Sequence, residues 1–266
     1  MTCLFGCTCN QPEQLAHALA PIRSALVADP PVERWGLGYI QGGEALLSRT
    51  PRRSEHPVDF YQQLERLRSH YVMGHAAVAD GLSGNVNTQP FRYRRWLFAQ
   101  EGTIADISRV QDKLLDHVPG FLRRNLHGKT PAEYMFHIFL SLLHDTKSVE
   151  DPNLPLAESR RALYAAIKLT KSVLNEDGVE YNLGNITASN GRSMLAARLE
   201  KPLYMRNLMV AESSRDRTKA DRDNGFRGVL LVSADTHPGE GFEEIPRESV
   251  LMVSRELRIE VAGVDS

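Results

Sequence analysis

The spacing of apolar positions changes twice along the chain and divides it into three parts. Up to residue 103, most segments show short apolar runs or alternate between apolar and polar residues, which is typical of β-strands. In the middle part, apolar residues recur every three or four positions, as in helices that bury one face. Strand patterns return from residue 181. This order predicts two sheets with flanking helices in a single domain over residues 1–266.

The pattern also predicts the individual elements. In the first part we expect strands at 2–8, 71–78 and 95–99, a hairpin over 35–47, and helices at 11–28 and 59–69. Residues 81–87 are predicted to form a polar loop, and 100–103 a turn. In the middle part, helices are expected at 131–144 and 155–174, separated by the charged stretch 145–153. The last part predicts strands within 181–190, 193–199, 203–211, 228–234 and 249–255, with a charged surface loop at 213–224.

Composition excludes several classes of protein. Apolar residues make up 42% and charged residues 24% of the 266 positions, as in ordinary globular proteins. Lys plus Arg total 32 and Asp plus Glu total 33, so the balance of charge gives no reason to expect a nucleic acid or an anionic membrane as partner. No apolar run approaches the ~20 residues of a membrane span, and no signal peptide is recognisable, so we expect a cytoplasmic protein.

All three cysteines lie in the first nine residues. Their odd number and close spacing argue against structural disulfides, and no second group of ligands completes a metal site. On a strand, Cys3, Cys7 and Cys9 share one face with Phe5 and behave as small apolar side chains. Among the interpretations of this chain, a redox or metal function of the cysteines ranks lowest.

Short segments in fixed order carry a resemblance to a known family. They are MTCLFG at 1–6, RWGLG at 34–38, GHAAVADG at 74–81, NTQPF at 87–91 and FAQEG at 98–102. They resemble the class II glutamine amidotransferases, and most of all the small stand-alone members, whose segments read Met-Cys-Arg-Leu-Leu-Gly, Gly-Trp-Gly-Ile-Gly, Gly-His-Val-Arg, Asn-Thr-His-Pro-Phe and Phe-Ala-His-Asn-Gly. The resemblance implies an α+β fold, the four-layer αββα sandwich of N-terminal-nucleophile hydrolases, with no cofactor and no metal.

The resemblance also implies a nucleophile at the start of the chain. Family members place a cysteine directly after the initiator methionine and use its own α-amine as base. Here that position is Thr2, and Cys3 follows one place later, where a strand turns its side chain to the opposite face. A threonine with a free amine can act as such a nucleophile. If Met1 is retained, however, Thr2 has no free amine.

Three further positions of the family's chemistry are substituted. The arginine that binds the substrate's carboxylate corresponds to Ala77, and the aspartate that holds its amine corresponds to Pro131. The asparagine of the oxyanion hole corresponds to Glu101, whereas Gly102 is kept. Each lost hydrogen bond to a charged group costs roughly 1.5–3 kcal/mol, and a lost oxyanion donor lowers the rate by ~10²–10³.

The positions of the scaffold, in contrast, match the family. They are Trp35, Gly36, Gly38, Gly74, His75, Asn87, Thr88, Pro90, Phe91, Phe98 and Gly102. We therefore expect a protein with the glutaminase fold and with lost or strongly impaired glutaminase activity. Such a protein would act as a scaffold, a regulatory subunit or a ligand-binding subunit.

The same alignment surrounds the former glutamine pocket with polar residues. The substrate-side positions are His75, Ala77, Asp80, Asn87, Thr88 and Gln89, next to Thr2 and Glu101. For His75, a packed and hydrogen-bonded role at the end of a strand is favoured over a catalytic one. No cation is recognisable in this group, so a small amine or amide is a better ligand than an anion.

Two alternatives stay open. The first is an active hydrolase of γ-glutamyl-type amides that uses Thr2 after removal of Met1. The second is a non-catalytic partner of a synthase or another subunit, because family members usually deliver ammonia to a synthase. In that case the loop at 213–224 is a candidate docking surface, although a solvated loop is the simpler interpretation.

Overall fold

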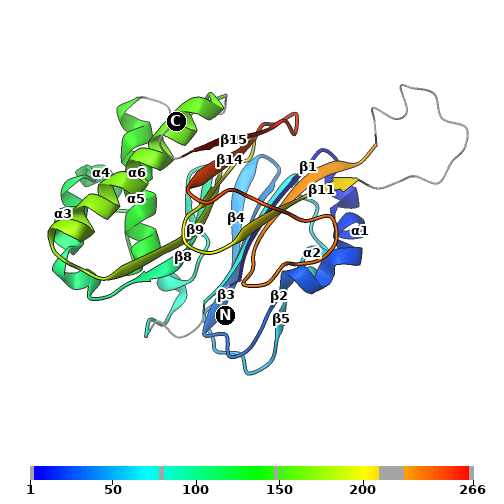
Figure 1. The fold of residues 1–266 in the computed structure, drawn as a ribbon, viewed down its shortest axis with the longest axis horizontal. Helices are drawn as coiled ribbons and strands as arrows, with labels where there is room; N and C mark the ends of the chain where they lie inside the picture. The colour runs from blue at the N-terminus through cyan, green and yellow to red at the C-terminus, as the bar shows by residue number, and fades with distance from the viewer. Residues whose placement is uncertain (1–2, 78–80, 147–148, 152, 210–224, 264–266) are drawn as a thin grey trace, which may run out of the picture.

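Two antiparallel sheets packed face to face form the centre of the molecule (Figure 1). The computed structural model describes residues 3–77, 81–146, 149–151, 153–209 and 225–263. In this part of the chain, the larger sheet contains β13 (Glu243–Glu244), β11 (Leu203–Met209), β12 (Arg227–Ser233), β1 (Cys3–Cys9), β6 (Tyr71–Ala77), β3 (Arg34–Gln41) and β4 (Glu44–Thr50), in that spatial order. The smaller sheet contains β15 (Ile259–Gly263), β14 (Ser249–Val253), β10 (Met194–Arg198), β9 (Tyr181–Ser189), β8 (Trp96–Ile104) and β7 (Phe91–Tyr93). The short strands β2 (Val27–Ala28) and β5 (Val58–Asp59) pair separately.

Helices cover the outer face of each sheet. Figure 1 shows α3 to α6 on one side of the sandwich and α1 and α2 on the other. The first group consists of α3 (Gln111–Asp116), α4 (Gly120–Arg123), α5 (Pro131–Asp145) and α6 (Leu156–Glu176), with the 3₁₀ turns η3 (Asn85–Asn87) and η4 (Ile107–Arg109) in the segments before them. The second consists of α1 (Leu15–Leu19), α2 (Phe60–Leu64) and the 3₁₀ segments η1 (Pro12–Gln14) and η2 (Ala20–Leu26).

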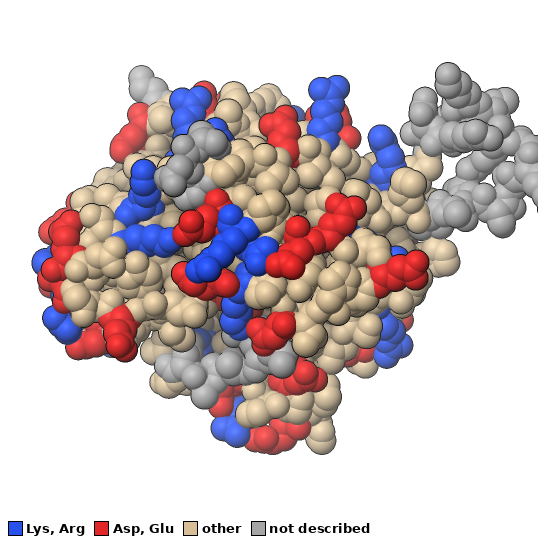
Figure 2. Space-filling view, viewed as in Figure 1, with Lys and Arg blue, Asp and Glu red and all other residues tan. Residues whose placement is uncertain are grey.

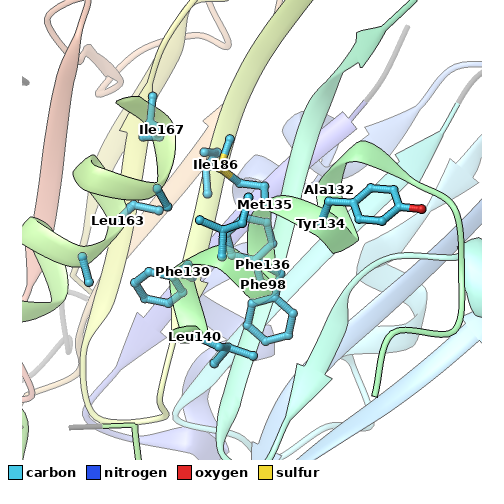
Figure 3. Close-up of a cluster of buried hydrophobic side chains, with 14 of the residues drawn as sticks. Phe98, Ala132, Tyr134, Met135, Phe136, Phe139, Leu140, Leu163, Ile167 and Ile186 are labelled. Carbon is cyan, nitrogen blue, oxygen red and sulfur yellow. The ribbon is translucent and has the colours of Figure 1, made fainter. Parts of the chain in front are cut away.

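Three buried apolar clusters separate the four layers. One lies between α5, α6 and the smaller sheet, where Phe98 of β8 stacks on Phe136 of α5 with ring centroids 5.1 Å apart (Figure 3). A second lies between the larger sheet and α1 and α2, and the third fills the space between the sheets. This succession confirms the predicted α+β fold with four αββα layers.

The long elements agree with the predictions from spacing, and the differences have local causes. The segment expected to be one helix over 11–28 is broken into η1, α1 and η2. Pro21 lacks the N–H that a continuing helix needs, and Ile22 leaves helical geometry (φ −120°, ψ 20°). The turn expected at 100–103 is wrong: β8 continues to Ile104 and contains a bulge between Gln100 and Gly102. The charged loop predicted at 213–224 lies outside the described residues.

Candidate functional site

A cavity of about 280 Å³ opens at the start of β1 and the end of β12. It is lined by Cys3, Ser24, Ala25, Val27, Ala28, Asp29, Val232, Ser233, Ala234, Thr236, His237 and Pro238. The sheet register brings the two strand ends together, since Leu4 of β1 pairs with Ser233 of β12. Its polar walls, and its place at the first residues of β1, make it the candidate site.

Behind Ser233, a buried carboxyl group lies between the two sheets. Glu101 of β8 is only 1% exposed, and its Oε2 accepts a hydrogen bond from the Ser233 hydroxyl. Asn185 of β9 donates to the same hydroxyl oxygen at 3.0 Å. Burial raises the pKa of Glu101 to about 7, while the hydrogen bond from Ser233 acts in the opposite direction. Among the described residues, the other carboxyl oxygen, Oε1, has no hydrogen-bond partner.

The backbone beside Glu101 is held in a bulge that only glycine fits. Gly102 has φ of +116°, and a Cβ placed there would lie 2.2 Å from the carbonyl oxygen of Asn182. On the other side of Glu101, the amide of Gln89 makes two hydrogen bonds with the main chain of Gln100, donating to its carbonyl oxygen at 2.9 Å and accepting from its N–H at 2.8 Å. The main chain is therefore fixed on both sides of Glu101.

His75 is buried next to Gln89. The ring is 3% exposed, and its Nε2 lies 3.4 Å from Nε2 of Gln89. Because Gln89 is itself bonded to the main chain of Gln100, the contact joins β6 of the larger sheet to β8 of the smaller one. This is the packed arrangement that the sequence favoured for His75.

Asn87 and Thr88 bond to nearby backbone. The Asn87 side chain accepts from the N–H of Lys129 at 2.8 Å and donates to the carbonyl of Ser83 at 2.7 Å. The Thr88 hydroxyl donates to the carbonyl of Gly84 at 3.0 Å. These bonds attach the loop before β7 to the segment that leads into α5.

The start of α5 is closed by its own polar residues. Thr130 accepts from the N–H of Glu133, and Pro131 occupies the first turn, where its missing N–H costs nothing. The Glu133 carboxylate accepts from the N–H groups of His127 and Gly128 at 3.0 and 2.7 Å. Pro131, which the resemblance aligns with the family's amine-binding aspartate, therefore supplies no side-chain acceptor here.

Ala77 lies opposite a buried arginine that the sequence analysis did not recognise. Arg34 of β3 pairs with Ala77 of β6 and is 3% exposed. It donates from Nε to the carbonyl of Asn87 at 2.9 Å and from Nη1 to that of Leu82 at 2.6 Å. The expectation of a polar group without a cation is thus wrong. The alternation of side chains in RWGLG could have located Arg34. It places Arg34 on the same strand face as Gly36, and Gly36 lies close to the carbonyl of Gln89.

Cys3 faces away from the space between the sheets. It packs with Phe5 and Cys7 against α1 and α2, whereas Leu4 lies in the cluster between the sheets. Burial, with smaller contributions from Glu101 and Asp29, raises the pKa of the Cys3 thiol to about 12. The predicted burial of the three cysteines is confirmed. The other candidate residues Thr2 and Asp80 lie outside the described residues.

The surface charge on one face and the metal-ligand chemistry of the described residues do not mark a second site. On the face drawn in Figure 2, Lys and Arg side chains are interspersed with Asp and Glu. Within the described ranges, no three His, Cys, Asp or Glu residues are placed to hold a metal ion. The helices of that part of the chain are also too short or too polar to cross a membrane.

Comparison with known proteins agrees with this geometry. The family model described as "Glutamine amidotransferases class-II" matches residues 1–209. The fold is similar to a class-II glutamine aminotransferase domain protein from Silicibacter pomeroyi (16% identity, TM-score 0.59) and to a predicted glutamine amidotransferase from Pseudomonas aeruginosa (17%, 0.58), with 98% of this chain and 99% of each of those chains covered. It is also similar to glutamine phosphoribosylpyrophosphate amidotransferase from B. subtilis (12%, 0.56), where 98% of this chain covers 49% of that one. No curated protein matches in sequence.

Proposed function

Because this chain belongs to the class II glutamine amidotransferases, we propose that it keeps their fold, has lost most or all glutaminase activity, and acts as a ligand-binding or regulatory subunit. The proposed ligand is a small amine or neutral amide in the cavity at the start of β1. The observation that carries the proposal is the environment of Glu101, which fills the position of the family's oxyanion-hole asparagine.

Glu101 is poorly suited to stabilise an oxyanion. The ionised carboxyl group only accepts hydrogen bonds, and one of its oxygens already accepts from Ser233. A negative charge developing beside it would be repelled rather than neutralised. Loss of one oxyanion donor typically lowers the rate by ~10²–10³, and a like charge nearby adds to this.

A cation lies near the position expected to bind a substrate carboxylate, but it is engaged by the protein's own backbone. Ala77 has no donor, and the guanidinium of Arg34 across the ladder donates to the carbonyls of Asn87 and Leu82. Those bonds fix the guanidinium against the protein's own backbone. Redirecting it to a substrate would leave buried carbonyls without donors, at a cost of ~1–3 kcal/mol each.

Cys3 does not replace the nucleophile. With a pKa of about 12, only about one thiol in 10⁵ is ionised at pH 7, and the thiolate is the reactive form. The side chain also packs on the helix-covered face of the sheet. This supports a site that binds without turnover.

The charge around the cavity favours an amine over an anion. Asp29 lines the cavity and Glu101 lies behind its Ser233 wall, and both carboxyl groups raise the pKa of Cys3 electrostatically. The same field attracts an ammonium group and repels a carboxylate. The cavity of about 280 Å³ suits a ligand the size of a small amino-acid amide.

One observation favours an active amide hydrolase as the second candidate. With a pKa of about 7, Glu101 is neutral in about half of the molecules at pH 7, and a neutral carboxyl group can donate a hydrogen bond to an oxyanion. This reaction also needs removal of Met1, so that Thr2 has a free α-amine to act as base.

Intact-mass spectra before and after exposure to the glutamine analogue diazo-oxo-norleucine, together with ammonia release from L-glutamine, test the loss of activity. We expect no adduct and no ammonia above that of a Thr2→Ala variant. A single adduct at a processed Thr2, with ammonia release that this variant abolishes, would establish the hydrolase instead.

Chemical-shift titration with a matched series tests the ligand class. We expect a primary amine and an uncharged amide to bind and a carboxylate of equal size not to bind. Asp29→Asn should weaken the amine, whereas Glu65→Gln, a change at an exposed carboxyl far from the cavity lining, should not. Preference for the carboxylate would contradict the proposal.

A protein partner is part of the same proposal. The B. subtilis amidotransferase joins a region similar to this chain, 49% of its length, to a further region. If a separate chain holds a comparable region, this protein would act as its regulatory subunit. Size-exclusion chromatography of the tagged protein purified at native abundance tests this, and a monomer of 29.8 kDa alone would speak against it.

A further inference from the structure

A second and larger cavity lies at the opposite end of β1 from Cys3. It has a volume of about 580 Å³ and is lined by Thr8, Cys9, Asn10, Pro12, Glu13, Ile40, Gln41, Gly42, Gly43, Arg68, His70, Arg95, Gly191, Arg192 and Arg255. These residues belong to strand ends and turns of both sheets: the turn between β3 and β4, the segment before β6, and the turns of the smaller sheet. The cavity is thus assembled from parts of the chain that are far apart in sequence.

Its lining is strongly basic in a chain that is otherwise balanced. The lining contains four arginines, from four different connections, but a single acid, Glu13. Over the whole chain, Lys plus Arg and Asp plus Glu differ by only one. In the described part of the chain, none of the four guanidinium groups has a carboxylate within the 4.0 Å of an ion pair.

The arginines also retain free donors. Nε of Arg95 is buried and has no hydrogen-bond partner among the described residues. Arg192 donates to the side-chain oxygen of Asn153 at 2.6 Å, and Arg68 donates to the carbonyls of Glu65 and Leu67 at 3.2 and 3.0 Å. A guanidinium has five donors, so these bonds leave most of them open. A buried donor without an acceptor is costly, and an anion in the cavity would satisfy it.

We propose that this cavity is a binding site for a small polyphosphate, held by Arg95, Arg192, Arg255 and Arg68. Guanidinium groups match phosphate oxygens in bidentate geometry, and four of them balance a ligand with three or four negative charges better than a single carboxylate. The lining contains no Phe, Tyr or Trp on which a base could stack, so the phosphates are the recognised part. The volume lies within the range of small-molecule sites.

This site is independent of the function proposed for the cavity at Cys3. The two cavities share no lining residue and lie at opposite ends of β1. Their proposed ligands also differ, since one is a cationic amine or a neutral amide and the other is a polyanion. A polyphosphate at the basic cavity would therefore act as a second ligand, whether or not the first site hydrolyses amides.

Calorimetric titration with sodium tripolyphosphate tests the proposal. We expect saturable binding in 50 mM salt, weakened about tenfold by Arg95→Ala and by Arg192→Ala. Arg66→Ala is the matched control, because Arg66 is exposed and close to Arg68 in sequence but does not line the cavity. If an alanine variant folds poorly, Arg95→Lys and Arg192→Lys replace it in the test. They keep the positive charge without the forked guanidinium, so the affinity for tripolyphosphate should fall less than in the alanine variants.

Further binding measurements distinguish the possible outcomes. ATP should bind no more than a few-fold tighter than tripolyphosphate, and Asp29→Asn at the other cavity should leave both affinities unchanged. No saturation by 1 mM tripolyphosphate, or equal weakening by Arg66→Ala, would overturn the proposal. It would also be overturned if a single-stranded RNA oligonucleotide bound far tighter than tripolyphosphate and displaced it.

Discussion

The hydroxyl group of Ser233 donates a hydrogen bond to the carboxyl group of Glu101 across the space between the two sheets. The two residues are 132 positions apart and belong to different sheets, Glu101 to β8 of the smaller sheet and Ser233 to β12 of the larger one. Ser233 also lines the cavity at the start of β1, so the bond connects that cavity to a carboxyl group that is itself almost inaccessible to water. Burial sets the raised pKa of this carboxyl group, and the hydrogen bond from Ser233 partly offsets the shift.

Stability should fall as pH rises through the titration range of Glu101. The pKa is raised from 4.5 to about 7 in the folded chain, so the folded state binds more protons than the unfolded state between these values. The contribution is complete below pH 4.5 and is lost above pH 7. Glu101→Gln removes this dependence. Between pH 4.5 and pH 8, the free energy of unfolding of this variant should rise by up to ~3 kcal/mol relative to that of the wild type. Urea unfolding at both pH values, with exposed Glu65→Gln as control, measures it.

A constant difference between wild type and Glu101→Gln over this pH range would contradict the raised pKa. In that case the carboxyl group would be ionised throughout and would need a cation close to it. Lys201, which forms a salt bridge with Asp235 at 3.8 Å, is a cation that lowers the pKa of Glu101.

Gly102→Ala should destabilise the fold strongly. The new Cβ would lie 2.2 Å from the main-chain oxygen of Asn182 and 2.5 Å from the nitrogen of Gly184, at a φ that L-residues rarely adopt. We expect a loss of ~3 kcal/mol or more in thermal or urea unfolding. Gly43→Ala is the control, since its φ is +83° but nothing lies within 4 Å. Its loss should stay near ~1 kcal/mol, and equal losses would refute the steric argument.

Gln89→Ala should lower stability, although the resemblance places Gln89 on the substrate side of the site. The change removes two hydrogen bonds and leaves the buried N–H of Gln100 without its acceptor. A loss of ~2–3 kcal/mol is expected from urea unfolding. Gln63→Ala on the exposed face of α2 should change stability by less than ~0.5 kcal/mol. If Gln89→Ala were equally mild, Gln89 would be available for a ligand.

The cysteines should resist alkylation in the folded protein. Burial raises the pKa of Cys3 and of Cys9 to about 12 and that of Cys7 well above its usual value, so thiolate is scarce at pH 8. Mass spectrometry after iodoacetamide treatment should show no adduct in native buffer and three in urea. Rapid native labelling of Cys3, which lines the cavity, would show that this thiol is reactive after all.

The elements that the sequence predicted are those with a strong local pattern. Apolar spacing placed α5 and α6 within two residues of their observed ends, and alternation placed Cys3, Phe5 and Cys7 on one buried face. It could not locate the bulge beside Gly102, since a bulge depends on which strand is the neighbour. The strand β7 has only three residues, which are too few for a period to show.

The sequence by itself determined the family and the layered fold, because motifs and periodicity are local properties of the chain. It also singled out Ala77 and Glu101, which the resemblance aligns with the family's arginine and asparagine. Only the tertiary structure decided what surrounds them: the Ser233 hydroxyl at Glu101, the Arg34 guanidinium opposite Ala77, and the four arginines collected from separate turns at the far end of β1. Pairing of distant strands creates these contacts, and desolvation and charge act through space, so no local pattern records them.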